Sequence, residues 1–182
     1  MSVNLCKLNL IIDKKGIKLL PFQYYNNLHF ITLPVNNKIP FLKGWNLLTK
    51  TVHPTTTLQN IAVLCGKVSG ISVLDFDSQE AIDIFNDLCK KNNYIINTPV
   101  VLTKKGMHIY FRYCKDLKSS LKLKINNKSI AIDFRSNGAL TLLPPSIIDG
   151  FKYKCKRNLS FNNVSIKPIP VWLKKFIKEH QS

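Results

Sequence analysis

Short apolar runs, separated by glycine, proline, asparagine and lysine, recur along most of the sequence. Runs of this kind that are rich in β-branched and aromatic side chains predict β-strands. We expect strands at Leu28–Leu33, Ile61–Cys65, Ile71–Phe76, Pro99–Thr103, Met107–Tyr113, Ser129–Phe134, Ala139–Leu143 and Phe151–Cys155. The first of these is expected to end at Pro34, because proline has no N–H to donate within a sheet.

Two segments have the period of a helix instead. After the strand that ends at Phe76, apolar residues follow the i, i+3, i+4, i+7 spacing of an amphipathic helix, at Ala81, Ile84, Phe85 and Leu88. We expect Asp77 or Ser78 to cap this helix and Asn92-Asn93 to end it. A final helix is predicted from about residue 170 to 179, with a buried stripe of Trp172, Phe176 and Ile177.

Turn residues between neighbouring runs predict two antiparallel strand pairs. Lys104-Lys105-Gly106 is expected to join Pro99–Thr103 to Met107–Tyr113. A second turn, Arg135-Ser136-Asn137-Gly138, is expected to join the strands on either side of it in the same way. The pattern therefore predicts a protein that mixes helices with antiparallel strands.

The length and composition are those of a single domain. A chain of 182 residues, of which 45% are hydrophobic, can bury a core, so we expect one domain over residues 1–182. The longest apolar stretches fall short of the ~18 residues that a membrane span needs. No N-terminal segment resembles a secretory leader. We expect a soluble, intracellular protein with no membrane partner.

Five cysteines are scattered along the chain, with no C-x-x-C pair and no cluster of cysteine with histidine. This distribution argues against a zinc site and against a disulfide framework. We expect the cysteines to be reduced packing residues.

The chain carries 27 Lys and Arg against 10 Asp and Glu, a net charge of +17. Such a charge attracts polyanions, among which nucleic acid is the first candidate. Lysine and asparagine are also frequent in proteins from AT-rich genomes, so composition alone leaves both explanations open. Basic residues beside the acidic motif described next favour nucleic acid.

Two of the few acidic residues, Asp75 and Asp77, stand together at the end of the apolar run Ile71–Phe76. Residues two apart on a strand project to the same side, so these carboxylates leave the sheet together. Like charges this close raise each other's pKa unless a cation lies between them. Together with a third carboxylate, Asp133, they are typical of a divalent-metal centre for phosphoryl transfer.

The strand Met107–Tyr113 places His108, Tyr110 and Arg112 on one face. The turn before it carries Lys104, Lys105 and a glycine. Lysine charge, a close backbone approach at glycine and a histidine donor suit a triphosphate.

Three of these residues, Asp77, Asp133 and His108, also have a structural explanation. Asp77 could be a helix cap, Asp133 could form a surface ion pair with Arg135, and a lone histidine on a strand is often structural. Asp75 has no such explanation, because an unpartnered carboxylate within a strand is costly. If these residues formed no functional site, all of the structural explanations would have to hold at once.

A series of motifs follows in order along the chain: Lys38-x-Pro40 with Gly44-Trp45, Asn60–Gly66, Val73–Asp77, Thr98–Thr103, Gly106–Phe111, Ile132–Ser136, Leu143–Ser146 before Asp149-Gly150 and Tyr153, and Pro168–Leu173. In this order and spacing they resemble the bifunctional primase–polymerase (Prim-Pol) domain of the archaeo-eukaryotic primase superfamily. The resemblance covers about residues 28–175 and leaves residues 1–27 unassigned.

The resemblance implies an α/β (α+β) fold of mainly antiparallel sheets, with flanking helices around a central cleft. It implies that Asp75, Asp77 and Asp133 hold two Mg²⁺ or Mn²⁺ ions, roughly 4 Å apart. His108 would bind the incoming triphosphate, with helpers from Lys104, Lys105, Arg112 or Arg135. Template or phosphate contacts are expected from Lys38 and Lys43. Gly106 stands where the family commonly has serine, which removes one hydroxyl near the phosphates.

The implied activity is template-directed nucleotidyl transfer by a DNA primase, a DNA polymerase or both, in the replication of a virus, plasmid or other mobile element. Its partners would be a single-stranded DNA template, a primer and dNTP or NTP, with a replicative helicase fused or separate. Two other functions remain open at this point: a metal-dependent nuclease that uses the same carboxylates, and an inactive module that binds single-stranded or origin DNA.

Overall fold

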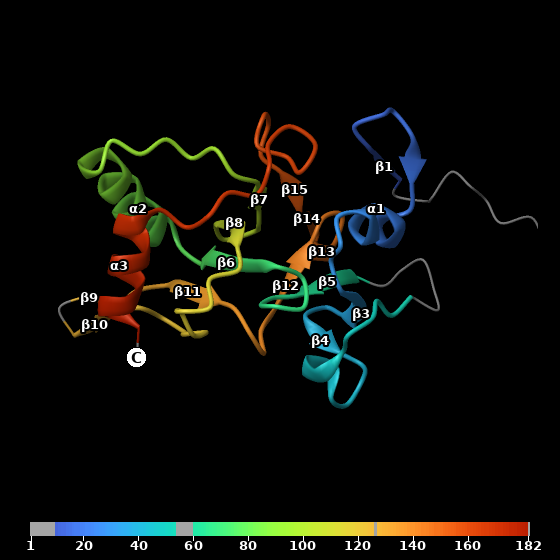
Figure 1. The fold of residues 1–182 in the computed structure, drawn as a ribbon, viewed down its shortest axis with the longest axis horizontal. Coiled ribbons are helices and arrows are strands. Elements are labelled where there is room, and N and C mark those ends of the chain that lie inside the picture. The colour runs from blue at the N-terminus through green and yellow to red at the C-terminus, as the bar shows by residue number, and fades with distance from the viewer. Residues whose placement is uncertain (1–9, 54–59, 126, 182) are drawn as a thin grey trace, which may run out of the picture.

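The structure is a computed structural model that describes residues 10–53, 60–125 and 127–181. Its helices are few, and most of its strands are short (Figure 1). The helices are α1 (Pro21–Asn27), α2 (Gln79–Lys91) and α3 (Val171–His180), with a 3₁₀ turn, η2 (Trp45–Leu47).

Two antiparallel sheets contain most of the described strand residues. The five-stranded sheet has the order β11 (Ile132–Arg135), β6 (Ile71–Phe76), β8 (Met107–Arg112), β7 (Val100–Leu102) and β15 (Lys154–Cys155). The four-stranded sheet has the order β12 (Leu140–Leu143), β5 (Asn60–Leu64), β3 (Thr32–Asn36) and β4 (Ile39–Pro40). Three two-stranded ribbons flank them: β1 (Ile11–Ile12) with β2 (Lys18–Leu19), β9 (Lys124–Ile125) with β10 (Lys128–Ser129), and β13 (Ile147–Ile148) with β14 (Phe151–Lys152). The mixture of helices with mainly antiparallel sheets is the expected α+β class.

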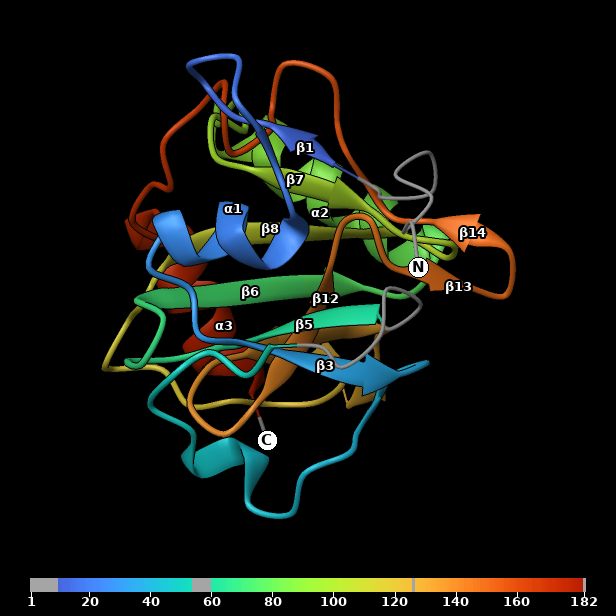
Figure 2. The same cartoon turned by 90° about the vertical axis from the view of Figure 1, so that its right-hand side faces the viewer.

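Strand alternation gives the five-stranded sheet a different core on each face. Leu74 and Phe76 of β6 pack in one core with residues of α2 and α3, which lie together on the left in Figure 1. Val73 of β6 and Tyr110 of β8 point the other way and pack in a second core with strands of the four-stranded sheet and α1. Figure 2 shows β6 and β8 above β5 and β3 in this arrangement. The charged residues of β6 and β8 share the face that is turned toward the four-stranded sheet.

Helix α2 begins where the capping pattern predicted. The Ser78 hydroxyl accepts a hydrogen bond from the N–H of Ala81 at 3.1 Å, and Asn92 is the C-cap. The helix buries Ala81, Phe85 and Cys89 against the sheet. Because Ser78 supplies the cap, the carboxylate of Asp77 is not needed for it.

The predicted pairing of Ser129–Phe134 with Ala139–Leu143 is wrong. β11 pairs with β6, whereas β12 pairs with β5 in the other sheet. The turn around Asn137 carries the chain between the sheets, beside the crossover from β5 to β6. The Asn137 side chain accepts a hydrogen bond from the N–H of Lys67 at 2.8 Å, and a Cβ on Gly66 would lie 2.1 Å from its Oδ1. A turn signal reports a change of direction, not which strands pair.

The predicted first strand is also wrong in its extent. Helix α1 occupies residues up to Asn27, and β3 starts only at Thr32, after His29 with a φ of 61°. β3 includes Pro34, which was expected to end it. The pairing of β3 with β4 stops at Val35, so no strand faces Pro34 on that side and its missing N–H is tolerated.

Two C-terminal expectations need smaller corrections. The segment Phe151–Cys155 is not one strand, because β14 and β15 belong to different sheets and Tyr153 lies between them. The buried stripe of α3 is Leu173 and Ile177, while Trp172 and Phe176 are only half-buried.

Candidate active site

Three polar side chains lie in one row across the five-stranded sheet. The antiparallel register places Asp133 of β11 opposite Asp75 of β6, and Asp75 opposite His108 of β8. Directly opposed residues project to the same face of a sheet. The row therefore follows from the register of three adjacent strands, and it brings together residues from distant parts of the sequence.

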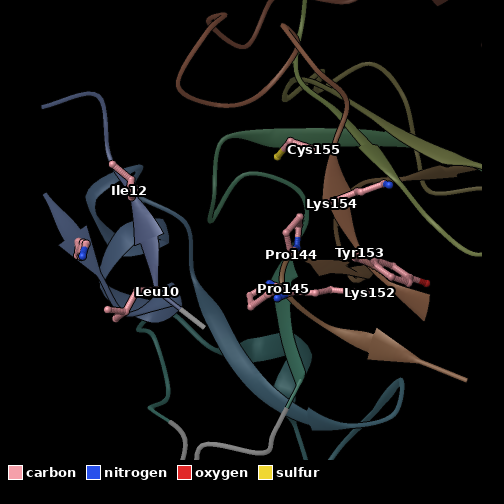
Figure 3. Close-up of a pocket in the computed structure, with 9 residues that line it drawn as sticks. Leu10, Ile12, Pro144, Pro145, Lys152, Tyr153, Lys154 and Cys155 are labelled. Carbon is pink, nitrogen blue, oxygen red and sulfur yellow. The ribbon is translucent and has the colours of Figure 1, made fainter. Parts of the chain in front are cut away.

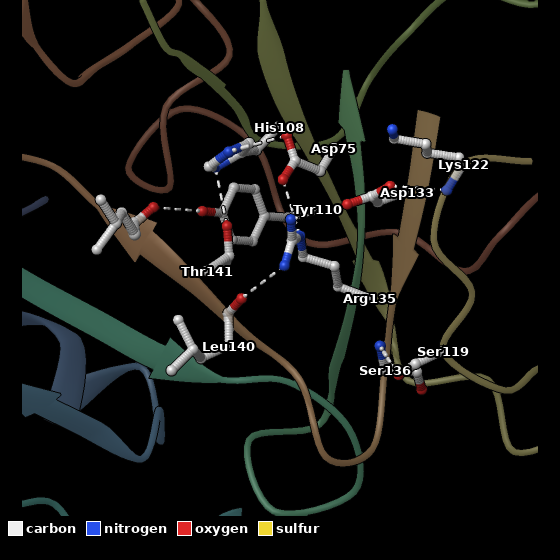
Figure 4. A network of polar contacts seen from close by, with 11 residues as sticks. Asp75, His108, Tyr110, Ser119, Lys122, Asp133, Arg135, Ser136, Leu140 and Thr141 are labelled. Carbon is white, nitrogen blue, oxygen red and sulfur yellow. Dashed lines mark hydrogen bonds and ion pairs between the residues drawn. The ribbon is translucent and has the colours of Figure 1, made fainter. Parts of the chain in front are cut away.

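The guanidinium of Arg135 joins the two carboxylates of this row (Figure 4). Its Nε donates to Oδ2 of Asp75 at 2.8 Å, and its Nη2 donates to Oδ2 of Asp133 at 2.9 Å. The exposed fraction of the side chain is 25% for Arg135, 7% for Asp75 and 13% for Asp133. The cluster is therefore partly buried and is not the surface ion pair that the sequence alone allowed.

Asp75 stays ionised in this setting although it is buried. Burial raises the pKa of Asp75, but the neighbouring His108 and the hydrogen bond from Arg135 outweigh burial and hold the pKa well below its usual range. Nε2 of His108 lies 3.3 Å from Oδ1 of Asp75, at ion-pair distance, but is not aligned to donate a hydrogen bond. Oδ1 of Asp75 is thus a buried, charged oxygen with no hydrogen-bond donor among the described residues.

The imidazole of His108 is held from the opposite sheet. Its Nδ1 lies 3.0 Å from the hydroxyl of Thr141 on β12. The ring is buried, and it packs edge-on against Tyr153 with ring centroids 5.8 Å apart. Both ring nitrogens therefore face polar partners, and the ring has little freedom to turn.

The three predicted metal ligands converge. Asp75, Asp77 and Asp133 each offer one oxygen, and these oxygens all lie within 4.8 Å of one another. Asp77 is exposed at the end of β6, Asp133 is half-buried and Asp75 is buried. Carboxylate oxygens are the ligands that Mg²⁺ and Mn²⁺ prefer. The buried Oδ1 of Asp75 accepts no hydrogen bond from a described residue and fits a cation as a partner, so the donor set suits a divalent metal.

The pKa of Asp133 is shifted upward, whereas that of Asp75 is shifted downward. Burial raises the pKa of Asp133, and the carboxylates of Asp75 and Asp77 raise it further. The backbone N–H of Lys122, which donates to its Oδ1 at 2.8 Å, and the guanidinium of Arg135 only partly offset this. The cluster carries more negative charge than Arg135 alone balances.

Gly106 is required by a close backbone approach. A Cβ at this position would lie 2.0 Å from the carbonyl oxygen of Phe76, the last residue of β6. The turn between β7 and β8 therefore lies directly against the strand end that presents Asp77. A hydroxyl is still present nearby, since Thr103 Oγ1 accepts a hydrogen bond from the N–H of Gly106 at 3.0 Å.

The other predicted site residues lie at different distances from the carboxylates. Lys104 and Lys105 are exposed on the turn that abuts β6, and Lys104 forms a 3.1 Å ion pair with Asp149. Arg112 lies at the opposite end of β8 from His108, paired with Ile71, and its Nε donates to the carbonyl of Ile166. The structure therefore does not bring Arg112 to the site.

Lys38 and Lys43 belong to the four-stranded layer. Lys38 lies in the turn between β3 and β4, and Lys43 lies in the turn before η2. Both are exposed, and neither joins the contacts around Asp75.

Sequence reasoning missed the contribution of β12 and of the segment before β15. Thr141 is a single polar residue within an apolar strand, and only the packing of the two sheets against each other brings it to His108. Tyr153 was noted within a motif but not as a neighbour of His108. Burial raises the pKa of Tyr153 to about 12, with smaller contributions from Asp75 and Asp77.

A separate hollow of about 560 Å³ lies between the β1–β2 ribbon and the Pro144–Pro145 segment (Figure 3). Lysines and apolar side chains line it, including Lys18, Lys154 and Tyr153. None of the three clustered carboxylates lines it. Tyr153 borders both the hollow and His108, so the hollow adjoins the site without containing its carboxylates.

The sequence matches the family described as the N-terminal domain of bifunctional DNA primase/polymerase (Prim-Pol) over residues 14–172. This chain belongs to the Prim-Pol family. The match includes residues 14–27, which the motifs left unassigned, and it ends within α3. No curated protein matches the sequence.

Membership gives the Prim-Pol domain a primase-like α+β fold and associates it with DNA synthesis from nucleotides on a DNA template. The acidic triad fits the use of a divalent metal by such an enzyme. None of the helices that the structure describes is long and apolar enough to cross a membrane.

Proposed function

We propose that this Prim-Pol domain catalyses template-directed nucleotidyl transfer, as a DNA primase, a DNA polymerase or both. One observation carries the proposal: ligand oxygens of Asp75, Asp77 and Asp133 converge within 4.8 Å beside His108. The sequence resemblance assigns the family's catalytic motifs to these same residues. The three carboxylates would hold two divalent ions, Mg²⁺ or Mn²⁺. When bound, such ions lower the pKa of an attacking 3′-hydroxyl and offset charge on the leaving pyrophosphate.

In this proposal His108 receives the triphosphate. If the Thr141 hydroxyl donates to Nδ1, the proton of the neutral ring lies on Nε2, which then faces the site as a donor. A phosphate oxygen would accept a hydrogen bond from Nε2, which now lies 3.3 Å from Oδ1 of Asp75.

Basic residues around the cluster would hold the charged substrates. Lys104 and Lys105 lie on the turn against the end of β6 and would contact the phosphates, once Lys104 leaves Asp149. Arg135 is already within the cluster. Lys38 and Lys43 would contact the template, and the net charge of +17 favours a polyanionic partner.

We also propose a biological setting: replication of a virus, plasmid or other mobile element, with a replicative helicase as partner. This part of the proposal is supported only by the replication roles that the family resemblance implies. No Walker motif occurs in the sequence, so the helicase would be a separate protein or another region of a longer one.

The test is synthesis on a single-stranded template with Mn²⁺ or Mg²⁺ and labelled nucleotides, with and without a primer. The double variant Asp75→Ala/Asp77→Ala is the matched control. Metal-dependent product that lengthens with the template and disappears in the double variant supports a polymerase. Product without primer adds primase activity.

The two rival functions, a nuclease and a DNA-binding module, predict different results in the same synthesis assay. A nuclease would shorten the template and need no triphosphate. A binding module would retain DNA equally well after Asp75→Ala and without metal. The intact set of three carboxylates, one of which keeps a buried oxygen that accepts no hydrogen bond from a described residue, favours the enzyme over the binding module.

A further inference from the structure

Arg135 occupies the same carboxylate oxygens that a second metal ion would need. Its Nε and Nη2 hold Oδ2 of Asp75 and Oδ2 of Asp133, at 2.8 and 2.9 Å. Its Nη1 lies 3.5 Å from the carbonyl oxygen of Leu140 on the opposite sheet. The guanidinium is therefore fixed between the two sheets, at the centre of the carboxylate cluster.

A first divalent ion can bind without displacing Arg135. Oδ1 of Asp75 accepts no hydrogen bond from a described residue, and Oδ1 of Asp133 holds only the N–H of Lys122. Asp77 is exposed. Each carboxylate thus keeps at least one oxygen that Arg135 does not touch.

A second ion meets a different situation. Two ions at the ~4 Å separation of two-metal sites share carboxylates, and a shared carboxylate uses both of its oxygens. Arg135 covers one oxygen on each of Asp75 and Asp133. The charges agree: three carboxylates and one guanidinium leave two negative charges, which one divalent ion neutralises. Another ion would leave a half-buried excess of positive charge, unless a triphosphate arrived with it.

We propose that Arg135 is an internal counter-cation that stands in for the second divalent ion until a nucleotide triphosphate draws the guanidinium onto its phosphates. This inference rests on the proposed function of the same site. The Nε and Nη2 donors, which now bind two separate carboxylates, can instead bind two oxygens of a phosphate, so the exchange keeps the number of hydrogen bonds. Arg135 would thereby couple entry of the second ion to binding of the nucleotide.

Metal binding to the whole chain tests this without any catalytic readout. Mn²⁺ is titrated without nucleotide, and free Mn²⁺ is followed by electron paramagnetic resonance. The wild type is expected to bind one ion, and a second only when a non-hydrolysable dNTP analogue is present. Arg135→Gln should bind two ions without nucleotide, with the first at least tenfold tighter. A merely structural arginine would give the opposite result, since its loss would loosen the carboxylates and weaken metal binding.

Two further variants make the test specific. Arg135→Lys keeps the charge and should still bind one ion without nucleotide. Arg112→Gln should match the wild type, because Arg112 lies on the same sheet but its side chain donates to the carbonyl of Ile166, away from the carboxylates. If Arg135→Gln does not fold, the wild type still decides, because two ions bound without nucleotide overturn the proposal.

Equal stoichiometry and affinity in the wild type and Arg135→Gln would also overturn it. In that case primer extension by the wild type leaves the proposed function intact. A wild type that binds no Mn²⁺ and makes no product contradicts both.

Discussion

The hydroxyl of Thr141 and Nδ1 of His108 lie 3.0 Å apart and join the two sheets at the edge of the carboxylate cluster. Thr141 belongs to β12 of the four-stranded sheet, whereas His108 belongs to β8 of the five-stranded sheet. The ring that faces Asp75 is therefore oriented by a residue of the opposite layer. This contact explains how a fold of two sheets fixes a site that lies on one of them.

Thr141→Val should alter the histidine without unfolding the protein. Valine has a similar shape and suits the apolar strand, but it removes the partner of Nδ1. We expect the tautomer of His108 to shift, which ¹⁵N NMR of the ring reports. A lost hydrogen bond of about 1 kcal/mol predicts a rise of several-fold in KM for the nucleotide. Thr141→Ser keeps the hydroxyl and should restore both readouts, and an unchanged tautomer in Thr141→Val would refute the role of Thr141.

Replacing Asp75 should destabilise the protein in EDTA, whereas replacing Asp77 should not. The lowered pKa of Asp75 means that its charged form stabilises the fold above the unfolded pKa of about 4, and that this stabilisation is lost at lower pH. Asp75→Asn should therefore reduce the free energy of unfolding by about 3 kcal/mol at pH 7. The deficit should shrink as the pH falls below about 4.

Asp77→Asn is the matched comparison. Its carboxylate is exposed and lies near Asp75 and Asp133, so removing its charge relieves repulsion. We expect the free energy of unfolding to stay within about 0.5 kcal/mol of the wild type or to rise. Urea unfolding at several pH values measures both variants, and equal losses for the two would contradict the assigned charge pattern.

Gly106→Ser should destabilise the protein, although the sequence resemblance led us to expect a serine at this position. Its Cβ would lie 2.0 Å from the carbonyl oxygen of Phe76, which is backbone and cannot move aside cheaply. We expect a loss of at least about 2 kcal/mol in urea unfolding. Lys105→Ala, at the exposed neighbouring position, should be neutral. A stable Gly106→Ser protein would mean that the turn can retreat from β6.

The buried thiols should be inert in the folded protein at moderately alkaline pH. Burial raises the pKa of Cys65 to about 12 and that of Cys89 to about 11. At pH 8.5 both are almost entirely protonated when folded, whereas an unfolded thiol, with a pKa of about 8.5, is half thiolate. Iodoacetamide followed by peptide mass spectrometry should label them only in urea. Labelling of Cys65 without urea would contradict its burial.

Much of the site was predictable because it depends on local pattern. The alternation in β6 and β8 fixed which side Asp75 and His108 face, and Asp77 follows from the same period. Helix α2 and its Ser78 cap likewise depend on neighbouring residues alone.

The rest depends on pairing between distant segments. Nothing near Arg135 in the sequence indicates that β11 lies beside β6 and that β12 joins the other sheet. The hydrogen bond from Arg135 to Asp75 and the contact between Thr141 and His108 both follow from that arrangement. The need for glycine at 106 depends on another long-range pairing, that of β8 with β6, which brings Gly106 against the carbonyl of Phe76.

The central claim is that Asp75, Asp77 and Asp133 bind the catalytic metal ions beside a triphosphate at His108. The most direct measurement is the anomalous scattering of Mn²⁺ in crystals grown with a non-hydrolysable dNTP analogue. We predict manganese peaks in contact with the three carboxylates and with the triphosphate, and a phosphate oxygen within hydrogen-bond distance of Nε2 of His108. Nucleotide bound elsewhere, with no manganese at the carboxylates, would contradict the claim.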